Sequence, residues 1–321
     1  MNTPLNRRHW IALAAAATFA SAAHAADNPI TIVVPYPPGG LSDTLARLTG
    51  KVMSQNMGVP VVIENKPGAN GVLGLQAIAR AKPDGSVIGM VPASVMTVNP
   101  ALYKNMGVDT LKDLSHLTLA ITVPNVLVVN PSVPAKDMAE LLSYLKGSGT
   151  KVTYGSMGTG SSAHLNGELL ARTAQLQITH APYKGSGPAM NDLVAGHIQM
   201  AFENLPVALP MIQSGKLRAI GVTSTSSSPQ APDIPPIGKT VPGFEDNIWF
   251  GFIAPAGVPA ATVKKLNEEL VRALRSDELS STMAARGAAI TTSTPEQMRK
   301  VVAADRDKWG ALVRERNITV E

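Results

Sequence analysis

Residues 30–43 read ITIVVPYPPGGLSD, and this stretch passes from a strand through a turn into a helix. The β-branched run over residues 30–34 predicts a strand, and the proline- and glycine-rich residues 35–40 predict a turn. Apolar side chains then recur with the i, i+4, i+7, i+11 spacing of an amphipathic helix at Leu41, Leu45, Leu48 and Val52. A strand that enters a helix through a short turn is the repeating unit of α/β proteins.

The same unit recurs along the chain. Strands are expected over residues 59–63 and 87–91, with a helix over residues 72–81 between them. This β–α–β–α–β order predicts a parallel, doubly wound sheet. The pattern restarts after residue 120, with strands expected over residues 125–129, 151–154 and 217–222 and helices over residues 138–145 and 163–174. Residues 223–242, rich in Ser, Thr and Pro, are expected to be irregular.

The carboxyl-terminal part of the chain predicts two further helices. One carries an apolar stripe at Val263, Leu266, Leu270 and Leu274, and the other begins at a capping box over residues 294–297 (TPEQ). The first β–α–β–α–β unit is too small to cover both faces of its own sheet. We therefore expect this segment to return to the first lobe, so that two chain crossings form a hinge with a cleft between two lobes. The expected lobes are residues 26–122 with 247–321, and residues 123–246.

The amino terminus has the pattern of a secretory signal peptide over residues 1–25. An arginine pair precedes an apolar stretch over residues 10–20, and residues 23–25 (AHA) form an A-x-A cleavage site. The apolar stretch is shorter than the roughly 20 residues that span a bilayer. We expect cleavage before Ala26 and a periplasmic mature protein. The arginine pair leaves a twin-arginine signal open as the alternative to ordinary secretion.

Composition excludes several classes of protein. With 45% hydrophobic and 16% charged residues among 321, the chain has enough apolar surface to fold and is not intrinsically disordered. Of its 28 basic residues, 26 remain without Arg7 and Arg8, against 23 acidic ones, so the mature charge is +3. These charges are scattered and aromatic residues make up only 4%, which argues against nucleic acid as a partner. The absence of Cys excludes disulfides and thiolate-bound metal. We expect a monomer that needs no cofactor.

Two loops carry the features of an anion site. Residues 35–43 and 155–164 each follow a predicted strand and lead into a helix, whose amino terminus presents free N–H groups and a partial positive charge. Their glycines let a ligand approach the backbone, and their serines add donors: Gly39, Gly40, Ser42, Ser156, Gly158, Gly160, Ser161 and Ser162. One such loop is ordinarily a helix cap, whereas one in each lobe favours an anion site in the cleft. Neither loop contains Arg or Lys, so backbone N–H groups, hydroxyls and water would meet the ligand charge.

Other chemistries fit the sequence less well. Residues 158–163 (GTGSSA) match a dinucleotide-binding fingerprint, but residues 176–181 contain no acid to bind a ribose. Ser156, His164 and Asp192 could form a hydrolase triad, although the chain has no G-x-S-x-G motif. The His residues lack the spacing of a metal site. A receptor without enzymatic activity is the first hypothesis, and an exported hydrolase acting on a small carboxylic ester or amide is the alternative.

Several short segments, taken together, resemble one family. They are residues 35–43 (PYPPGGLSD), 65–71 (NKPGANG), 83–85 (PDG), 154–156 (YGS) with 161–165 (SSAHL), 183–185 (YKG), and 250–251 (FG) with 254–257 (APAG). In this order, and across residues 27–321, the chain resembles the Bug receptors. These are the extracytoplasmic solute receptors of tripartite tricarboxylate transporters.

The resemblance implies an α/β type II periplasmic-binding-protein fold, with two doubly wound lobes joined by two hinge crossings and a ligand cleft between them. It also implies a small carboxylate ligand (a di- or tricarboxylate, or an aromatic acid) and the membrane components of a tripartite tricarboxylate transporter as partners. The ligand-binding residues carried over by motif are Tyr36, Gly39, Gly40, Ser42, Asp43, Ser156, Gly160, Ser161 and Ser162, with Tyr183 and Asn204 as further wall residues.

The sequence departs from the commonest family pattern at two places. Tyr36 stands where Phe is frequent, and Glu203 stands where Asp is frequent. These departures bear on which carboxylate is bound, not on the fold. Asp43 has a second interpretation, as an acid in the first helical turn that interacts favourably with the helix dipole.

Overall fold

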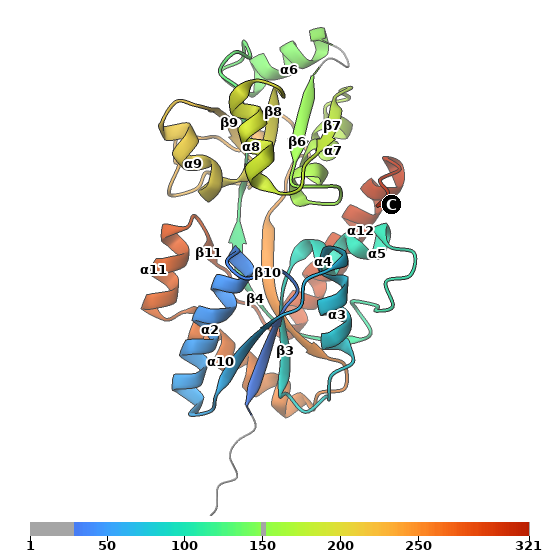
Figure 1. Cartoon of the computed structure of the whole chain (residues 1–321), viewed down its shortest axis with the longest axis vertical. Helices are drawn as coiled ribbons and strands as arrows, with labels where there is room; N and C mark the ends of the chain where they lie inside the picture. The colour runs from blue at the N-terminus through green and yellow to red at the C-terminus, as the bar shows by residue number, and fades with distance from the viewer. Residues whose placement is uncertain (1–28, 149–151, 321) are drawn as a thin grey trace, which may run out of the picture.

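The computed structural model describes residues 29–148 and 152–320, and it shows an α/β protein of two lobes, one above the other (Figure 1). Lobe 1, the lower one, is built on a six-stranded sheet. Its strands are, in spatial order, β11 (Ala289–Ile290), β4 (Leu114–Val123), β10 (Ile248–Pro255), β3 (Val87–Pro92), β1 (Ile30–Val34) and β2 (Val61–Asn65). Lobe 2 is built on a second, five-stranded sheet.

The first sheet is mixed, which corrects the prediction of a parallel sheet. β1 pairs in parallel with β2 and β3 as expected, whereas β10 runs antiparallel to β3 and to β4. The chain leaves lobe 1 through β4 and comes back through β10. β3 and β4 run toward lobe 2, whereas β10 comes from lobe 2. β10 is therefore antiparallel to both.

Helices cover both faces of the first sheet, and the side chains of β1 show how. Ile32 and Val34 face α2 (Leu41–Met57), α10 (Ala260–Leu274) and α11 (Asp277–Ala285). Val33, on the opposite side of the strand, faces α3 (Val72–Ala79), α4 (Ala93–Thr97) and α12 (Pro295–Glu315). This alternation is the period of two expected for a strand buried on both faces.

The second sheet orders its strands as β7 (Thr179–Pro182), β6 (Thr153–Ser156), β8 (Met200–Asn204), β5 (Asn125–Val129) and β9 (Arg218–Val222). β6 is parallel to β7 and β8, while β5, which enters from lobe 1, is antiparallel to β8 and β9. α6 (Met138–Ser148) and α7 (Ser162–Thr173) cover one face. α8 (Ser186–Ala195) and α9 (Leu205–Gln213) cover the other.

The chain passes between the lobes at Pro124 and again between β9 and β10, and the two passages are bonded to each other. Asn125 N–H donates to Thr223 Oγ1 at 3.0 Å, and Thr223 N–H donates to the Asn125 carbonyl at 2.9 Å. Asp246 N–H in turn donates to the Thr223 carbonyl at 2.9 Å. The two hinge crossings expected from the sequence are therefore joined side by side. The residue limits assigned to the lobes remain a prediction.

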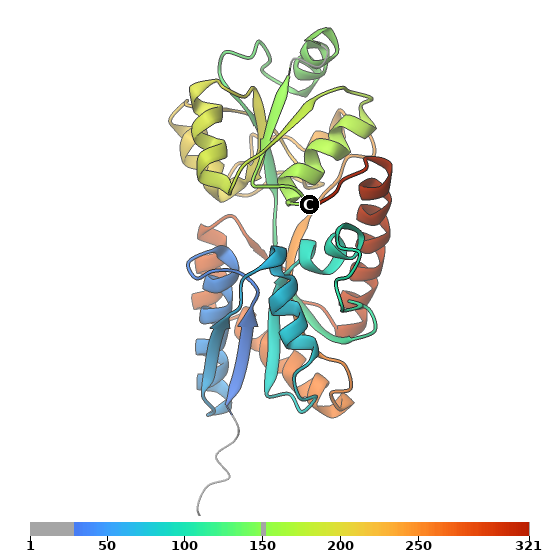
Figure 2. The same cartoon turned by 45° about the vertical axis from the view of Figure 1, so that its right-hand side comes forward.

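The carboxyl-terminal helix reaches both lobes, which refines the expectation that this segment returns to lobe 1. α12 begins at the predicted capping box, where Gln297 N–H donates to Thr294 Oγ1 at 3.2 Å and Thr294 N–H donates to Gln297 Oε1 at 2.9 Å. Its far end carries Trp309 and Leu312 into the apolar core of lobe 2. Figure 2 shows α12 running along the side of lobe 1 up to lobe 2.

The predicted signal peptide, residues 1–25, lies outside the described residues. Within residues 29–148 and 152–320, none of the helices combines the length and the apolar character needed to cross a membrane.

Candidate functional site

The first loop, residues 35–43, joins β1 to α2 and leaves the start of α2 uncapped. Its N-cap residue is Gly40, which has no side chain to form a capping hydrogen bond. The first N–H groups of an α-helix have no acceptor within the helix, so those of Leu41 and Ser42 can serve a ligand. Gly39 has φ +93°, and a Cβ added at Gly39 or Gly40 would meet no atom within 4 Å. The turn therefore opens onto free space.

Asp43 shapes this turn from the inside. Its Oδ2 accepts from Gly39 N–H at 3.0 Å and from Arg47 Nε at 2.9 Å, and its Oδ1 accepts from Asn65 Nδ2 at 3.0 Å. The hydrogen bond from Arg47, helped by those from Gly39 and Asn65, lowers the pKa of Asp43 to about 2. Both oxygens of this buried carboxylate therefore accept hydrogen bonds within the protein. These contacts favour a role for Asp43 in supporting the loop over a role in contacting the ligand.

Tyr36 connects the first loop to two asparagines that the sequence analysis did not single out. Its hydroxyl donates to Asn70 Oδ1 at 3.3 Å, and Asn70 Nδ2 donates to Asn99 Oδ1 at 3.0 Å. Burial raises the pKa of Tyr36 to about 12, so the phenol stays protonated and can donate. The signal for Asn70 was its place in residues 65–71, one of the segments that carry the family resemblance.

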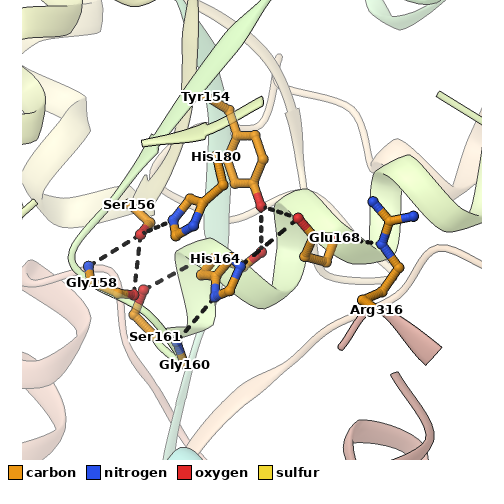
Figure 3. A network of polar contacts seen from close by, with 9 residues as sticks. All are labelled: Tyr154, Ser156, Gly158, Gly160, Ser161, His164, Glu168, His180 and Arg316. Atoms are coloured by element: carbon orange, nitrogen blue, oxygen red, sulfur yellow. Dashed lines mark hydrogen bonds and ion pairs between the residues drawn. The ribbon is translucent and has the colours of Figure 1, made fainter. Parts of the chain in front are cut away.

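The second loop, residues 155–164, is supported from within lobe 2 by Ser156 (Figure 3). The Ser156 hydroxyl accepts from Gly158 N–H at 3.1 Å and lies 2.7 Å from Nε2 of His180 on β7. Ser156 is only 1% exposed. The structure therefore places this predicted ligand residue beneath the loop, where its hydroxyl is used by the protein itself.

The start of α7 is capped by its own residues. The N-cap residue Ser161 accepts from His164 N–H at 3.3 Å, and Gly160 N–H donates to His164 Nδ1 at 3.0 Å. Gly160 has φ +80°, a backbone conformation that glycine adopts without strain. The N–H groups of Ser162 and Ala163, in the first turn of α7, have no acceptor within the helix. They are the backbone donors that this loop can offer to a ligand.

Two stacked histidines lie beneath the second loop. The His164 and His180 rings are parallel to within 7°, with 3.8 Å between their centroids. Burial lowers the pKa of His180 to about 4 and also lowers the pKa of His164, so both rings are neutral at pH 7. Glu168, one turn further along α7, accepts from Tyr154 Oη at 2.6 Å and pairs with Arg316 Nε at 2.5 Å. The network thus extends from the loop to the end of α12.

Strand directions bring the two loops to the same region between the lobes. β3 ends at Pro92 beside Phe250, where β10 enters from lobe 2, so the carboxyl ends of β3 and its parallel neighbour β1 point toward lobe 2. Asn204, the last residue of β8, pairs with Asn125, the first residue of β5 after the crossing. β8 and its parallel neighbour β6 therefore end toward lobe 1.

The surroundings of Gly160 place the second loop next to lobe 1. A Cβ added at Gly160 would lie 2.4 Å from Leu102 Cδ1 and 3.9 Å from Asn70 Nδ2. Ser162 Oγ accepts from Asn125 Nδ2 at 3.4 Å, and the buried Asn125 Oδ1 has no hydrogen-bond partner among the residues that the structure describes. The structure therefore gathers Gly160 and Ser162 with two asparagines that sequence reasoning missed.

Tyr183 and Asn204, the two further wall residues, form hydrogen bonds with other residues of lobe 2. Tyr183 Oη donates to Asp192 Oδ2 at 2.7 Å. Asn204 precedes α9, and its N–H donates to Glu203 Oε1 at 2.8 Å. Burial raises the pKa of Glu203, whose other carboxylate oxygen accepts from Ser186. These contacts place both residues on the lobe 2 side of the site.

The three residues considered for a hydrolase triad do not meet. Ser156 contacts His180, His164 binds the loop backbone, and Asp192 accepts from Tyr183. Within the described part of the chain, the His, Cys, Asp and Glu side chains form no group of three that could hold a metal ion.

A separate hollow of about 470 Å³ lies beside the chain crossings. It is lined by Pro124 and Asn247 from the two passages, by residues 226–230 and by residues 287–290. The lining contains no charged side chain and none of the candidate ligand residues. It is therefore distinct from the two loops and lacks their glycine turns before a helix start.

Known proteins resemble this chain over nearly its whole length. The family model described as "Tripartite tricarboxylate transporter family receptor" matches residues 45–318. Protein BugT of Bordetella pertussis is 34% identical over 308 residues, which cover 95% of this chain and 94% of BugT. The structure of R. palustris Rpa4515 with adipate has a TM-score of 0.81 and 31% identity, and the match covers 92% of this chain and 100% of that chain. MatC from Rhodopseudomonas palustris, with bound malate, has a TM-score of 0.76 and 29% identity over 89% and 98% of the two chains.

The family match begins inside α2, ends just beyond α12, and includes strands of both sheets. The family resemblance and the two-lobed α/β fold expected from the sequence are thereby confirmed. The chain belongs to the family of tripartite tricarboxylate transporter receptors, and it is a periplasmic solute-binding protein.

Proposed function

We propose that this receptor captures a small carboxylate between its two lobes and delivers it to the membrane components of a tripartite tricarboxylate transporter. The observation that carries the proposal is the convergence of two helix starts, α2 from lobe 1 and α7 from lobe 2. Each presents backbone N–H groups and the positive end of a helix dipole, which suit an anion. The strand directions in the two lobes and the packing of Gly160 against Leu102 of lobe 1 support this convergence.

The ligand charge is met without a side-chain cation in this proposal. Neither loop contains Arg or Lys, and the Arg47 guanidinium is paired with Asp43 at 2.9 Å. The donors are N–H groups at the two helix starts and the hydroxyl of Ser162, because the Tyr36 hydroxyl donates to Asn70. Hydrogen bonds to a charged group contribute about 1.5–3 kcal/mol each. A few of them are enough for micromolar affinity, which corresponds to about −8 kcal/mol.

Dicarboxylates are the first class of ligand to test. Two solved relatives are described with adipate and with malate, and each of these molecules carries two carboxylates. Thermal unfolding and calorimetric titration of the mature protein with both acids, and with their diamides as uncharged controls, test the proposal. At 100 times its dissociation constant, a bound acid should add about 2.7 kcal/mol to the free energy of unfolding. Diamides that bind as well as the acids would show that the site does not recognise a carboxylate.

We also propose export with cleavage before Ala26 and a monomeric mature protein. The A-x-A pattern at residues 23–25 supports the cleavage position. Mass spectrometry of protein recovered from the periplasm should give the mass of residues 26–321. An intact amino-terminal Met on that protein would contradict the cleavage.

The contact between Ser156 and His180 favours one second candidate, an exported hydrolase of small carboxylic esters or amides. A Ser hydroxyl 2.7 Å from an imidazole nitrogen is the first element of a nucleophilic site. Its burial opposes that role. Incubation with an activated ester such as p-nitrophenyl acetate should give no turnover. Turnover that Ser156→Ala abolishes would replace the receptor proposal with the hydrolase.

A further inference from the structure

The loop backbone fixes the protonation state of the His164 ring. Nδ1 accepts from Gly160 N–H at 3.0 Å, so Nδ1 carries no proton and the neutral ring carries its proton on Nε2. Nε2 lies 3.9 Å from Glu168 Oε1. A second proton could be added only at Nδ1, where it would point at the Gly160 N–H. Protonation of His164 is therefore incompatible with this hydrogen bond.

His180 adds a second constraint on charge beneath the loop. Its Nε2 lies 2.7 Å from Ser156 Oγ, and its ring stacks on His164 with 3.8 Å between centroids. Two imidazolium rings at this separation repel each other, so a charge on one ring opposes a charge on the other. Burial is the main cause that lowers the pKa of both residues, and the charge of Glu168 works in the opposite direction.

The ionisable groups around the stacked rings of His164 and His180 form hydrogen bonds or ion pairs with other residues. Tyr154 on β6 donates to Glu168, and Glu168 also pairs with Arg316, which follows α12. β8 contributes Glu203, whose carboxylate is bound to Ser186 and Asn204. At the far end of α7, Arg172 pairs with Glu315 of α12 at 3.0 Å. The Glu168 carboxylate is thus the charge that lies close to His164, and Arg316 partly offsets it.

We infer that His164 and His180 are positioning residues, which hold residues 156–162 in the ligand-receiving conformation as neutral stacked rings and release this loop when acid protonates His164 Nδ1. The inference rests on the proposed function in one respect, that the second loop contacts the ligand. The folded protein favours the neutral rings, so the loop is fully held above about pH 6.5. The hold is lost as the pH falls below 6.5 and through the pKa of His164, which burial lowers.

Hydrogen exchange at the Gly160 amide tests the inference without any ligand. The mature protein is studied by NMR from pH 7.5 to pH 4, with exchange corrected for its intrinsic pH dependence and the ring tautomers read from ¹⁵N shifts. His164 should show the Nε2–H tautomer at pH 7.5, and Gly160 protection should fall at least tenfold toward pH 4. The Thr44 amide, which donates to the Gly40 carbonyl at 3.0 Å in the first loop, should keep its protection.

Three results would overturn the inference: an Nδ1–H tautomer of His164, rings that stay neutral down to pH 4, or Gly160 protection that does not change while the rings titrate. Two variants add a rescue test. His164→Asn keeps an acceptor near the Nδ1 position but cannot titrate, so Gly160 protection should be retained and become independent of pH. His164→Ala should lose that protection at every pH, with circular dichroism confirming that it folds.

His116 provides the matched control. It is a second buried histidine, on β4 of lobe 1, and burial lowers its pKa to about 4 as well. His116→Gln should leave the pH profile of Gly160 exchange unchanged, since His116 lies on β4, away from the second loop. An equal effect of His116→Gln would assign the pH response to general acid unfolding and would contradict the inference.

Calorimetric titration with adipate and malate tests whether protonation of His164 also weakens ligand binding. The dissociation constant of the acid that binds should rise more between pH 7.5 and pH 4 in the wild type than in His164→Asn, because protonation of the ligand's own carboxylates affects both proteins equally. Equal rises in the two proteins would contradict the link between the loop and the ligand. If neither acid binds at pH 7.5, the proposed carboxylate function fails for these ligands, while the exchange data still decide the role of His164.

Discussion

The two glycine-rich loops share one sequence pattern and are held in opposite ways. In the first, α2 starts at Gly40 without a side-chain cap, and Asp43 reaches back from the helix to the turn. In the second, Ser161 caps α7 and His164 binds the Gly160 amide from below. The first loop opens onto free space, and the second is packed against lobe 1.

This difference shows that a glycine turn before a helix indicates where an anion can bind. It does not indicate how many backbone N–H groups remain free to bind that anion. The second loop uses several of its own donors to keep one shape. The first loop keeps the donors at its helix start free. We therefore expect the second loop to be sensitive to changes of shape, and the first loop to tolerate them.

Adding a methyl group to each loop should give the largest contrast. Gly160→Ala forces a side chain into φ +80° and places Cβ 2.4 Å from Leu102 Cδ1. The backbone strain should cost about 1–2 kcal/mol of the free energy of unfolding, because Leu102 Cδ1 is the end of a flexible side chain and can move away. Gly40→Ala has φ −77° and open space around it, so the free energy of unfolding should change by less than about 0.5 kcal/mol. Urea unfolding of both variants measures this, and equal losses of stability would remove the distinction between the loops.

Removal of the Ser162 hydroxyl should have the next largest effect. Ser162→Ala deletes a donor at the start of α7, whose oxygen accepts from Asn125 Nδ2 at 3.4 Å. The loss should be about 1.5 kcal/mol, or roughly tenfold in affinity, because the hydrogen bond is made to a charged ligand. Titration of Ser162→Ala against the wild type checks it, with Ser161→Ala as the control that removes the cap instead of a ligand donor. Normal binding by Ser162→Ala would place the carboxylate away from α7.

Acid should weaken the first loop only at a lower pH than the second loop, because Asp43 supports the first loop as a charged carboxylate. The folded-state pKa of Asp43 is about 2, below its ordinary value of 3.8, so its contribution to stability is present above about pH 4 and is lost as the pH falls toward 2. Asp43→Asn should cost about 1 kcal/mol, since Arg47, its partner, is half exposed and solvent weakens the pair. Urea unfolding of both proteins between pH 7 and pH 2 measures the difference. It should be constant down to about pH 4 and vanish toward pH 2, and a difference that persists at pH 2 would contradict this role of the Asp43 charge.

The smallest effect is expected at Lys184, an exposed residue that follows β7. A solvated charge at the margin of the site contributes about 0–1 kcal/mol. Lys184→Ala should therefore bind adipate or malate within about fivefold of the wild type. Abolished binding in this variant, with Ser162→Ala unaffected, would mean that a side-chain cation holds the anion.

Elements with a strong local signal were predictable from the sequence. The helix over residues 41–57 has a clear apolar period, and the capping box at residues 294–297 marks the start of α12. β10 was not predicted because all of its residues are buried, so IWFGFIAP shows no alternation and contains Gly251 and Pro255. Its position and direction depend on β3 and β4, which are distant in sequence.

The residues of the candidate site also fall into two groups, those with a local sequence signal and those brought together by strands distant in sequence. The glycine pattern identified Gly160 and the serines beside it, because backbone conformation is a local property. His180 could not be linked to Ser156 from the sequence, because the parallel pairing of β6 with β7 brings them together across 24 positions. Asn125 was likewise read as the start of a strand, and its place beside Ser162 depends on how β5 enters lobe 2.

A crystal structure of the mature protein with adipate or malate, at a concentration that saturates the site, tests the central claim most directly. The account predicts carboxylate oxygens within hydrogen-bond distance of the first N–H groups of α2 and α7, with Ser162 as a further donor. A carboxylate paired with a Lys or Arg side chain, or a ligand in the hollow lined by residues 226–230, would contradict it.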